Sequence, residues 1–223
     1  MPKLRTLKIP KSIASILERR KEPLFTINPT TSALLVVDMQ RDFLVKGAPL
    51  WQSHYEKIVP NVAKLIEFCR EKKISVIWVA EVRSPHGHDA GLMDMMWPRK
   101  GQKGHLIRGS DGAKIYEGLP RPLDSEVLIE KHRYSAFYQT DLELHLRNMG
   151  IDTLFITGLN SNICCQTTAR DGFMRDFKIV MVSDGTAAQP AELHEPGLLE
   201  ILVAFGRVLS SDEVIQEVKS QLR

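Results

Sequence analysis

The chain has 223 residues, a length that suits one large α/β domain with a sizeable buried core. Its 43% hydrophobic and 26% charged residues are typical of a soluble globular protein. The net charge of +3 is too small and too scattered to indicate a nucleic-acid partner, and no apolar run approaches the roughly 20 residues that a membrane helix needs.

The cysteines and the first residues indicate a cellular compartment. Three cysteines, two of them adjacent, do not form a disulfide framework. The N-terminus is basic, but it has no continuous apolar core and no small-residue cleavage site, so we expect no secretory signal. These features predict a cytoplasmic protein with reduced thiols.

The sequence predicts an N-terminal arm, residues 1–30, followed by a single domain, residues 31–223. The arm is polar, has one short amphipathic stretch at 13–17, and contains four prolines, at positions 2, 10, 23 and 29. We expect it to lie on the body of the domain or on a neighbouring subunit.

The domain alternates apolar runs with segments of helical spacing, which predicts an α/β fold. Uniformly apolar runs are typical of parallel strands covered on both faces. In chain order we expect a strand at 33–38, a helix at 59–69, strands at 74–80 and 127–131, a helix at 141–149, a strand at 154–157, a helix at 164–175, a strand at 179–183, a helix at 192–205 and a short strand at 208–209.

The segment between Glu81 and Glu126 breaks this rhythm. It is rich in glycine and charge and has little periodicity. Segments of this length without structure of their own are usually functional or act as lids. We therefore expect it to carry substrate specificity.

Three apolar runs end on, or one turn before, a residue that can do chemistry: Asp38, Lys131 and Cys164. Ligands of open α/β sheets bind outside the carboxyl ends of the strands, so these side chains can meet although they are far apart in sequence. An acid, a lysine and a cysteine in one place form a set that activates a nucleophile. This conjunction predicts an enzyme.

Each of these residues taken alone has a simpler interpretation. Asp38 can cap a turn, Lys131 can be a surface lysine beyond a strand, and Cys164 can be a buried small hydrophobe, as most free cysteines are. Consecutive helical residues point about 100° apart, so only one of Cys164 and Cys165 can face the crevice, and we expect Cys165 to be buried. The conjunction of all three residues favours the active site.

The predicted chemistry is acyl transfer. A free thiol has a pKa near 8.5, and a helix N-terminus and Lys131 both favour the thiolate of Cys164. Asp38 can accept the thiol proton and return it to a leaving amine. Backbone N–H groups in the turn before Cys164 can hold the oxyanion that forms when a thiolate attacks a carbonyl.

The same runs carry a resemblance to a known family. Residues 38–43 read D-M-Q-R-D-F, residues 131–137 read K-H-R-Y-S-A-F, and residues 158–171 match G-x-x-[ST]-x-x-C-x-x-x-T-x-R-D. With Asp184 at the end of the fifth strand, residues 31–211 resemble the isochorismatase-like cysteine hydrolases. That family includes nicotinamidases, N-carbamoylsarcosine amidohydrolases and ureidoacrylate amidohydrolases.

The resemblance implies a three-layer, doubly wound fold with a central, mainly parallel sheet of about six strands. It implies a triad of Asp38, Lys131 and Cys164 and a cis peptide bond between Leu159 and Asn160. The backbone N–H groups of Asn160 and Cys164 would then form the oxyanion hole. Asn160 stands where the family usually has a small residue, and its side chain either reaches the substrate or fills space.

The sequence departs from the metal-binding nicotinamidases. Their D-x-H after the second strand corresponds here to Glu81-Val82-Arg83, and a guanidinium cannot ligate a metal. His86 and His88 with Asp89 offer an alternative zinc site. The favoured interpretation is a site without metal or other cofactor, in which Arg83 pairs a substrate carboxylate or carbonyl; a solvated surface arginine is the alternative.

By resemblance the chain is most similar to the ureido and carbamoyl branch, so the expected substrate is a small linear ureide, carbamoyl compound or carboxamide that releases ammonia. Phe43, Trp97 and Tyr134 are candidate pocket walls, with ordinary core positions as the alternative. We expect a homo-oligomer, a dimer or tetramer, with no nucleic-acid or membrane partner.

Other functions remain open at this point. The runner-up is an isochorismatase-type vinyl-ether hydrolase, which needs the acid but not the thiol, or a nicotinamidase-like amidase. A non-catalytic scaffold is disfavoured by the intact triad. A redox role for Cys164-Cys165 is disfavoured because adjacent cysteines form only a strained ring.

Overall fold

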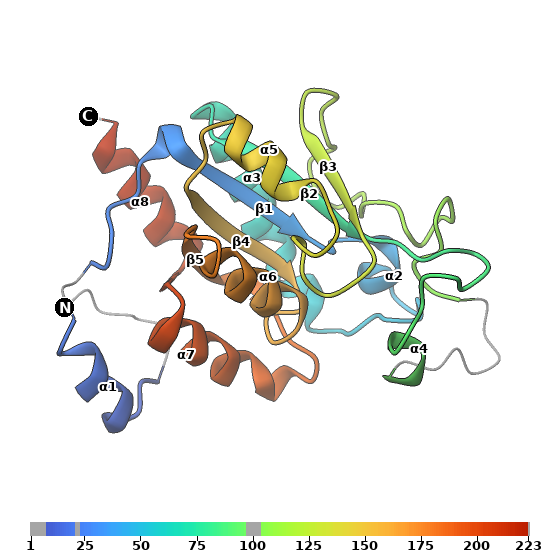
Figure 1. Ribbon diagram of the computed structural model, residues 1–223, viewed down its shortest axis with the longest axis horizontal. Helices are drawn as coiled ribbons and strands as arrows, with labels where there is room; N and C mark the ends of the chain where they lie inside the picture. Colours follow the sequence, from blue (N-terminus) through green and yellow to red (C-terminus); the bar gives the residue numbers. More distant parts are fainter. Residues whose placement is uncertain (1–7, 21–22, 97–103, 223) are drawn as a thin grey trace.

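The computed structural model describes residues 8–20, 23–96 and 104–222, which form a six-stranded sheet between two layers of helices (Figure 1). The strand order is β3-β2-β1-β4-β5-β6, and every neighbouring pair is parallel. The strands are β1 Ser32–Val37, β2 Ser75–Glu81, β3 Val127–Lys131, β4 Thr153–Leu159, β5 Lys178–Ala187 and β6 Arg207–Leu209. The predicted doubly wound α/β fold is confirmed.

The central strands are apolar because both faces of the sheet are covered. Every residue of β1 and β4 is buried, and successive residues of β1 face opposite layers. Leu34 and Val36 belong to one core cluster, whereas Ala33, Leu35 and Val37 belong to the other. Burial on both faces therefore follows directly from the uniform apolar runs.

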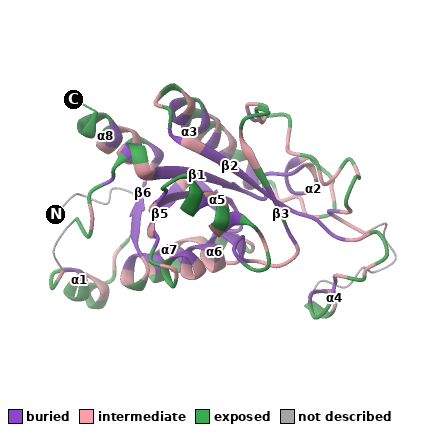
Figure 2. Ribbon diagram, turned by 45° about the horizontal axis from the view of Figure 1, so that its top comes forward, coloured by how far each residue is buried: buried purple, intermediate pink, exposed green. Residues whose placement is uncertain are grey.

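Helices of opposite layers cover the two faces (Figure 2). One layer holds α3 Val59–Glu71 and α8 Ser211–Gln221. The 3-10 turn η2 Tyr55–Ile58 comes directly before α3 in the chain. The other holds α5 Leu142–Asn148, α6 Cys164–Phe173 and α7 His194–Ala204, and the short helix α2 Arg41–Leu44 follows β1. The four predicted helices lie within two residues of their observed bounds.

Besides the short helices α2 and α4, which were not expected, two larger elements differ from expectation. β5 continues to Ala187, beyond the predicted end at 183, because its pairing with β4 shifts register between Ile156 and Gly158 and carries the strand onward. α8 was not predicted. Its start is fixed by a capping box in which the Ser210 side chain and Glu213 satisfy each other's backbone N–H groups.

The described part of the N-terminal arm lies against the domain. Helix α1 Lys11–Leu17 packs beside α7, with Leu17 buried in the core under that layer. The Arg20 guanidinium donates to the carbonyl of Leu202 at 2.8 Å. The chain then reaches β1 through the fully buried Ile27.

The described residues of the segment after β2 cross the carboxyl ends of the strands and include one short helix, α4 Met93–Met96. Two polar residues just after β1 hold it in place. The Gln40 amide donates to the carbonyls of Glu81 and Ala113, and the Asp42 carboxylate accepts the N–H of Leu106 at 2.6 Å. Gln40 and Asp42 therefore tie this segment over the end of the sheet.

No helix in the described ranges combines the length and apolar character required to cross a membrane.

Gly158 sets how closely β1 and β4 approach at the ends that carry Asp38 and Asn160. It has φ +105°, and a Cβ there would overlap the carbonyl oxygen of Val37. We expect Gly158→Ala to lower the free energy of unfolding by roughly 3 kcal/mol or more, because backbone of a buried strand must move.

Gly47→Ala is the matched control for this prediction. Gly47 also has a positive φ of +84°, but open space surrounds it, so only the backbone strain of about 1 kcal/mol applies. Chemical denaturation of both variants measures the difference. Equal losses would show that the close approach of β1 and β4 is not limiting.

Candidate active site

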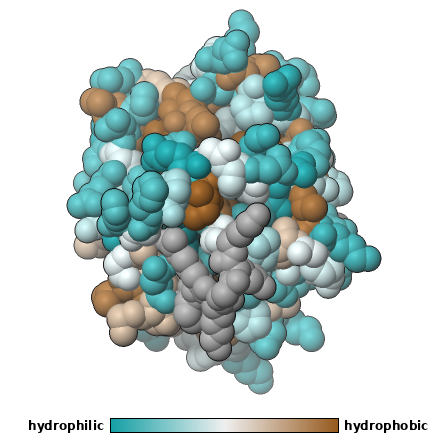
Figure 3. All heavy atoms as spheres, turned by 90° about the vertical axis from the view of Figure 1, so that its right-hand side faces the viewer, coloured by the Kyte–Doolittle hydropathy of each residue, from teal (hydrophilic) through white to brown (hydrophobic). Residues whose placement is uncertain are grey.

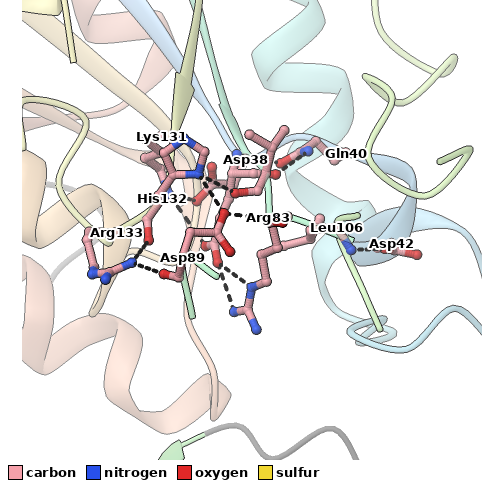
Figure 4. A network of polar contacts seen from close by, with 12 residues as sticks. Asp38, Gln40, Asp42, Arg83, Asp89, Leu106, Lys131, His132 and Arg133 are labelled. Atoms are coloured by element: carbon pink, nitrogen blue, oxygen red, sulfur yellow. Dashed lines mark hydrogen bonds and ion pairs between the residues drawn. The ribbon is translucent and has the colours of Figure 1, made fainter. Parts of the chain in front are cut away.

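Asp38 and Lys131 meet at the carboxyl ends of β1 and β3 (Figure 4). The Lys131 Nζ lies 2.8 Å from Asp38 Oδ2, and both side chains are fully buried. Cys164 is the first residue of α6, and the Asp38 carboxylate, the Glu81 carboxylate and the Cys164 thiol lie within 4.8 Å of one another. The structure thus brings together the three residues that the strand-end pattern singled out.

Glu81 is a fourth member of this cluster that the sequence reasoning missed. Its Oε2 lies 3.5 Å from Lys131 Nζ, and its Oε1 accepts from Arg83 at 2.9 Å. Glu81 ends β2 and pairs in register with Lys131 on β3. The strand-end rule that identifies Asp38 and Lys131 applies equally to Glu81, the last residue of β2.

Arg83 is neither exposed nor solvated, so the surface-arginine alternative is wrong. It is 7% exposed, and its Nε and Nη2 both donate to Glu81 Oε1. Asp38, Lys131, Glu81 and Arg83 therefore form a chain of alternating charge. A buried ammonium between two carboxylates needs this pairing, since an unpaired buried charge is costly.

Burial dominates the protonation of the site. It raises the pKa of Asp38; Lys131 opposes this and Glu81 adds to it, with a net value of about 6. Burial also raises the pKa of the Cys164 thiol well above its usual range, although Lys131 opposes the shift. The expected lowering of the thiol pKa is thus wrong, because desolvation outweighs the nearby ammonium.

The ammonium of Lys131 remains charged. Burial would lower its pKa, but the carboxylate of Asp38 and the other acidic neighbours raise it overall. Lys131 Nζ forms an ion pair with Asp38 Oδ2 at 2.8 Å, and the Cys164 thiol also lies close to the Asp38 carboxylate. At rest the site therefore holds a protonated thiol on Cys164 beside the carboxylate of Asp38, which is paired with the ammonium of Lys131.

The turn from β4 into α6 leaves two backbone N–H groups free. The peptide bond between Leu159 and Asn160 is cis. The Asn160 carbonyl accepts from the N–H of Ile163 and of Cys165, whereas the N–H groups of Asn160 and Cys164 donate to none of the described residues. Cys165 is fully buried, with Sγ 3.8 Å from the carbonyl of Thr157, in keeping with its expected orientation.

The remaining residues of the sequence motifs hold the site together. The Ser135 hydroxyl donates to Asp171 at 2.6 Å, and Thr168 Oγ1 accepts the N–H of Ala136 at 3.0 Å. These bonds join the loop after Lys131 to the helix that begins at Cys164. Asp184 caps α8, where it accepts from the N–H and hydroxyl of Ser211.

A small pocket that opens to solvent lies over Cys164. Of the predicted substrate-binding residues, Phe43, Arg83, Tyr134 and Asn160 line it, and Trp97 lies outside the described residues. The other lining residues are Leu50, Glu81, Met93, His105, Leu106, Ile163 and Gln189. Figure 3 views the molecule from the side toward which β1 points, where hydrophobic residues are scattered among hydrophilic ones.

The described residues do not support the alternative zinc site. The exposed rings of His86 and His88 lie 5.7 Å apart, and Asp89 binds the N–H of Ser84 and contacts His132 instead. In the described ranges the single group with three close ligand atoms is Asp38, Glu81 and Cys164. Lys131 already places a cation against both carboxylates of that group.

The electrostatic cluster predicts a titration that NMR can measure. We expect the Asp38 carboxyl carbon to titrate near pH 6, and Glu81→Gln to lower that pKa because a negative charge is removed beside it. Asp38→Asn assigns the resonance, and Glu200→Gln, on the exposed side of α7, is the matched control with no shift. An Asp38 pKa at its ordinary value of 3.8 in the parent would contradict this electrostatic account.

The comparisons with known proteins agree with this geometry. The sequence model of a protein family, the isochorismatase domain, matches residues 32–213 of this chain. A cysteine hydrolase from Pseudomonas syringae is 32% identical, with a TM-score of 0.83 over 88% of this chain and 96% of that one. An N-carbamoylsarcosine amidase from Thermoplasma acidophilum is also 32% identical, with a TM-score of 0.71 over 82% of this chain and 98% of its own.

Curated relatives point to the same family. The ureidoacrylate amidohydrolase RutB of Methylobacterium radiotolerans is 30% identical over 86% of this chain and 81% of its own length. Enterobactin synthase component B of Escherichia coli is 33% identical over 96% of this chain and 72% of its own length. A match over most of the chain, with the same fold, has one meaning: this chain belongs to the isochorismatase family of hydrolases.

Proposed function

We propose that the protein is a cysteine-dependent amidohydrolase that cleaves a C–N bond of a small linear ureide, carbamoyl compound or carboxamide and releases ammonia. The observation that carries this proposal is the buried Asp38–Lys131 ion pair beside the Cys164 thiol, at the base of a pocket. Asp38, Lys131 and Cys164 act as the catalytic triad.

The first step joins the thiol to the substrate. Because the Cys164 pKa is raised, little thiolate exists at neutral pH, and attack on the carbonyl carbon requires a base. Asp38, with a pKa of about 6, is mostly ionised at pH 7 and takes the proton as the S–C bond forms. Lys131 keeps Asp38 oriented and balances its charge.

The second step releases ammonia. The oxyanion of the tetrahedral intermediate accepts hydrogen bonds from the free backbone N–H groups of Asn160 and Cys164. Protonated Asp38 gives its proton to the departing nitrogen as the C–N bond breaks, which leaves a thioester on Cys164. A water molecule, deprotonated by Asp38, then attacks the thioester and restores the thiol.

The pocket walls fit a small substrate. Phe43 and Tyr134 supply apolar and aromatic surface, and the Arg83 guanidinium pairs a carboxylate or carbonyl of the substrate. The relatives named ureidoacrylate amidohydrolase and N-carbamoylsarcosine amidase support the ureido and carbamoyl branch. We further propose that the enzyme works in the cytoplasm without a metal or other cofactor, as a dimer or tetramer.

A vinyl-ether hydrolase of the isochorismatase type is the second candidate. A buried carboxylic acid with a raised pKa is also suited to protonating a substrate carbon, and such a reaction does not need the thiol. The amidohydrolase is favoured because Cys164 lines the pocket beside Asp38, and a thiol next to a base is the arrangement that nucleophilic catalysis requires.

Ammonia release from a substrate panel tests the proposal. The panel contains nicotinamide, N-carbamoyl amino acids, biuret and ureidoacrylate. We expect activity on at least one compound and a loss of at least about a thousandfold in Cys164→Ala, because the nucleophile is removed.

Cys165→Ala is the matched control, since it removes the adjacent buried thiol that bonds to Thr157 instead of facing the substrate. It should keep ammonia release near that of the parent. No ammonia from any compound, with isochorismate cleaved equally by the parent and by Cys164→Ala, would overturn the thiol mechanism in favour of the second candidate.

A further inference from the structure

One buried phenol lies between two amide side chains on the wall of the pocket. Tyr55, on η2, is fully buried, and its hydroxyl lies 2.5 Å from Asn160 Oδ1 and 3.2 Å from Gln189 Oε1. Asn160 and Gln189 both line the pocket with Cys164, whereas Tyr55 lies behind them. The three residues come from separate segments that the sequence motifs do not link.

The hydrogen atoms of this trio determine which amide ends remain free. A phenol has one hydrogen to donate, and the shorter contact assigns it to Asn160 Oδ1. The structure places Gln189 Oε1 at the phenol, but the phenol has no second hydrogen to give it. We therefore turn the Gln189 amide over by 180°, which its shape allows, so that Nε2–H donates to the phenol oxygen. Asn160 Nδ2, which has no partner among the described residues, and Gln189 Oε1 are left over.

The backbone holds both amides firmly. Asn162 binds Gln189 at both main-chain groups: its Nδ2 donates to the Gln189 carbonyl at 3.0 Å, and its Oδ1 accepts the Gln189 N–H at 3.3 Å. The Asn160 carbonyl accepts two bonds from the start of α6. The free ends of the two amides are therefore a preorganised donor and acceptor beside the thiol.

We propose that this pair makes the site specific for ureides, R–NH–CO–NH2, over simple carboxamides; this rests on the proposed amidohydrolase function. Gln189 Oε1 accepts the N–H that joins the carbamoyl group to the substituent. Asn160 Nδ2 donates to an oxygen of the substituent. Tyr55 is a positioning residue, because it fixes which end of each amide faces the substrate.

The physical basis is the cost of an unpaired polar group. A carboxamide of the same shape has a methylene in place of the ureide N–H, and it would desolvate Gln189 Oε1 without replacing the lost hydrogen bond. We expect the ureide to be preferred by about 10- to 100-fold in kcat/KM, the size that one such unpaired group gives.

Two pairs of isosteres test this inference in the full-length protein: N-carbamoylglycine with succinamate, and propylurea with pentanamide. Within each pair, the ureide N–H is replaced by CH2. In whichever pair the parent protein cleaves, it should have the higher kcat/KM for the ureide. Gln189→Leu should abolish this preference by lowering kcat/KM for the ureide alone. Tyr55→Phe should reduce the same ratio, a readout that a merely structural role would not move.

The controls separate the possible failures. Tyr138→Phe changes a half-exposed phenol that does not line the pocket and should leave the ratio unchanged. Equal kcat/KM for ureide and isostere in the parent, with ammonia release that still depends on Cys164, would overturn the specificity inference alone. No Cys164-dependent ammonia from any of the four compounds would overturn the proposed function and the inference with it.

Discussion

The site depends on one buried ammonium held between two carboxylates. Lys131 lies at the end of β3, within ion-pair distance of Asp38 and Glu81, and Arg83 neutralises the second carboxylate. Removing such charges from water is costly, and only close pairing repays it. The arrangement leaves Asp38 with a pKa of about 6, poised to exchange a proton near neutrality.

The sheet supplies that pairing. β3, β2 and β1 are neighbours, so Lys131, Glu81 and Asp38 reach one edge from adjacent parallel strands. β4 lies on the other side of β1 and carries the turn into α6 that places the thiol. The fold therefore positions the base, the ammonium and the thiol. The motif residues around them hold the loops in place. Gln40 and Asp42 bind the segment that covers the end of the sheet, and Ser135 and Asp171 join the loop after Lys131 to α6.

The parts that sequence reasoning predicted are those with a repeating physical signal. Uniform apolar runs predicted the strands, helical spacing predicted four helices within two residues, and strand ends predicted Asp38, Lys131 and Cys164. The same rule would have found Glu81. Helix α8 was missed, although Ser210 and Glu213 form a capping box that is readable in the sequence.

Other features depend on three-dimensional surroundings. The sequence predicted a lowered pKa for the Cys164 thiol, and this prediction was wrong because the burial of the thiol, which raises its pKa, cannot be read from a sequence. The burial of Arg83 likewise depends on the folded chain, because Leu106 and Arg108 of the covering segment bond to the Arg83 backbone while the Arg83 side chain pairs with Glu81. Tyr55 and Gln189 lie in stretches without periodicity, so their meeting with Asn160 could be found only from the folded chain.

The central claim is that a covalent bond to Cys164 lies on the reaction path. The most direct measurement is acid quenching during turnover of a cleaved substrate, followed by mass spectrometry of the peptide that contains Cys164 and Cys165. The account predicts an acyl adduct on Cys164 that accumulates and decays with turnover and is absent from Cys164→Ala. Turnover that proceeds at the parental rate in Cys164→Ala, with no adduct on the parent, would contradict it.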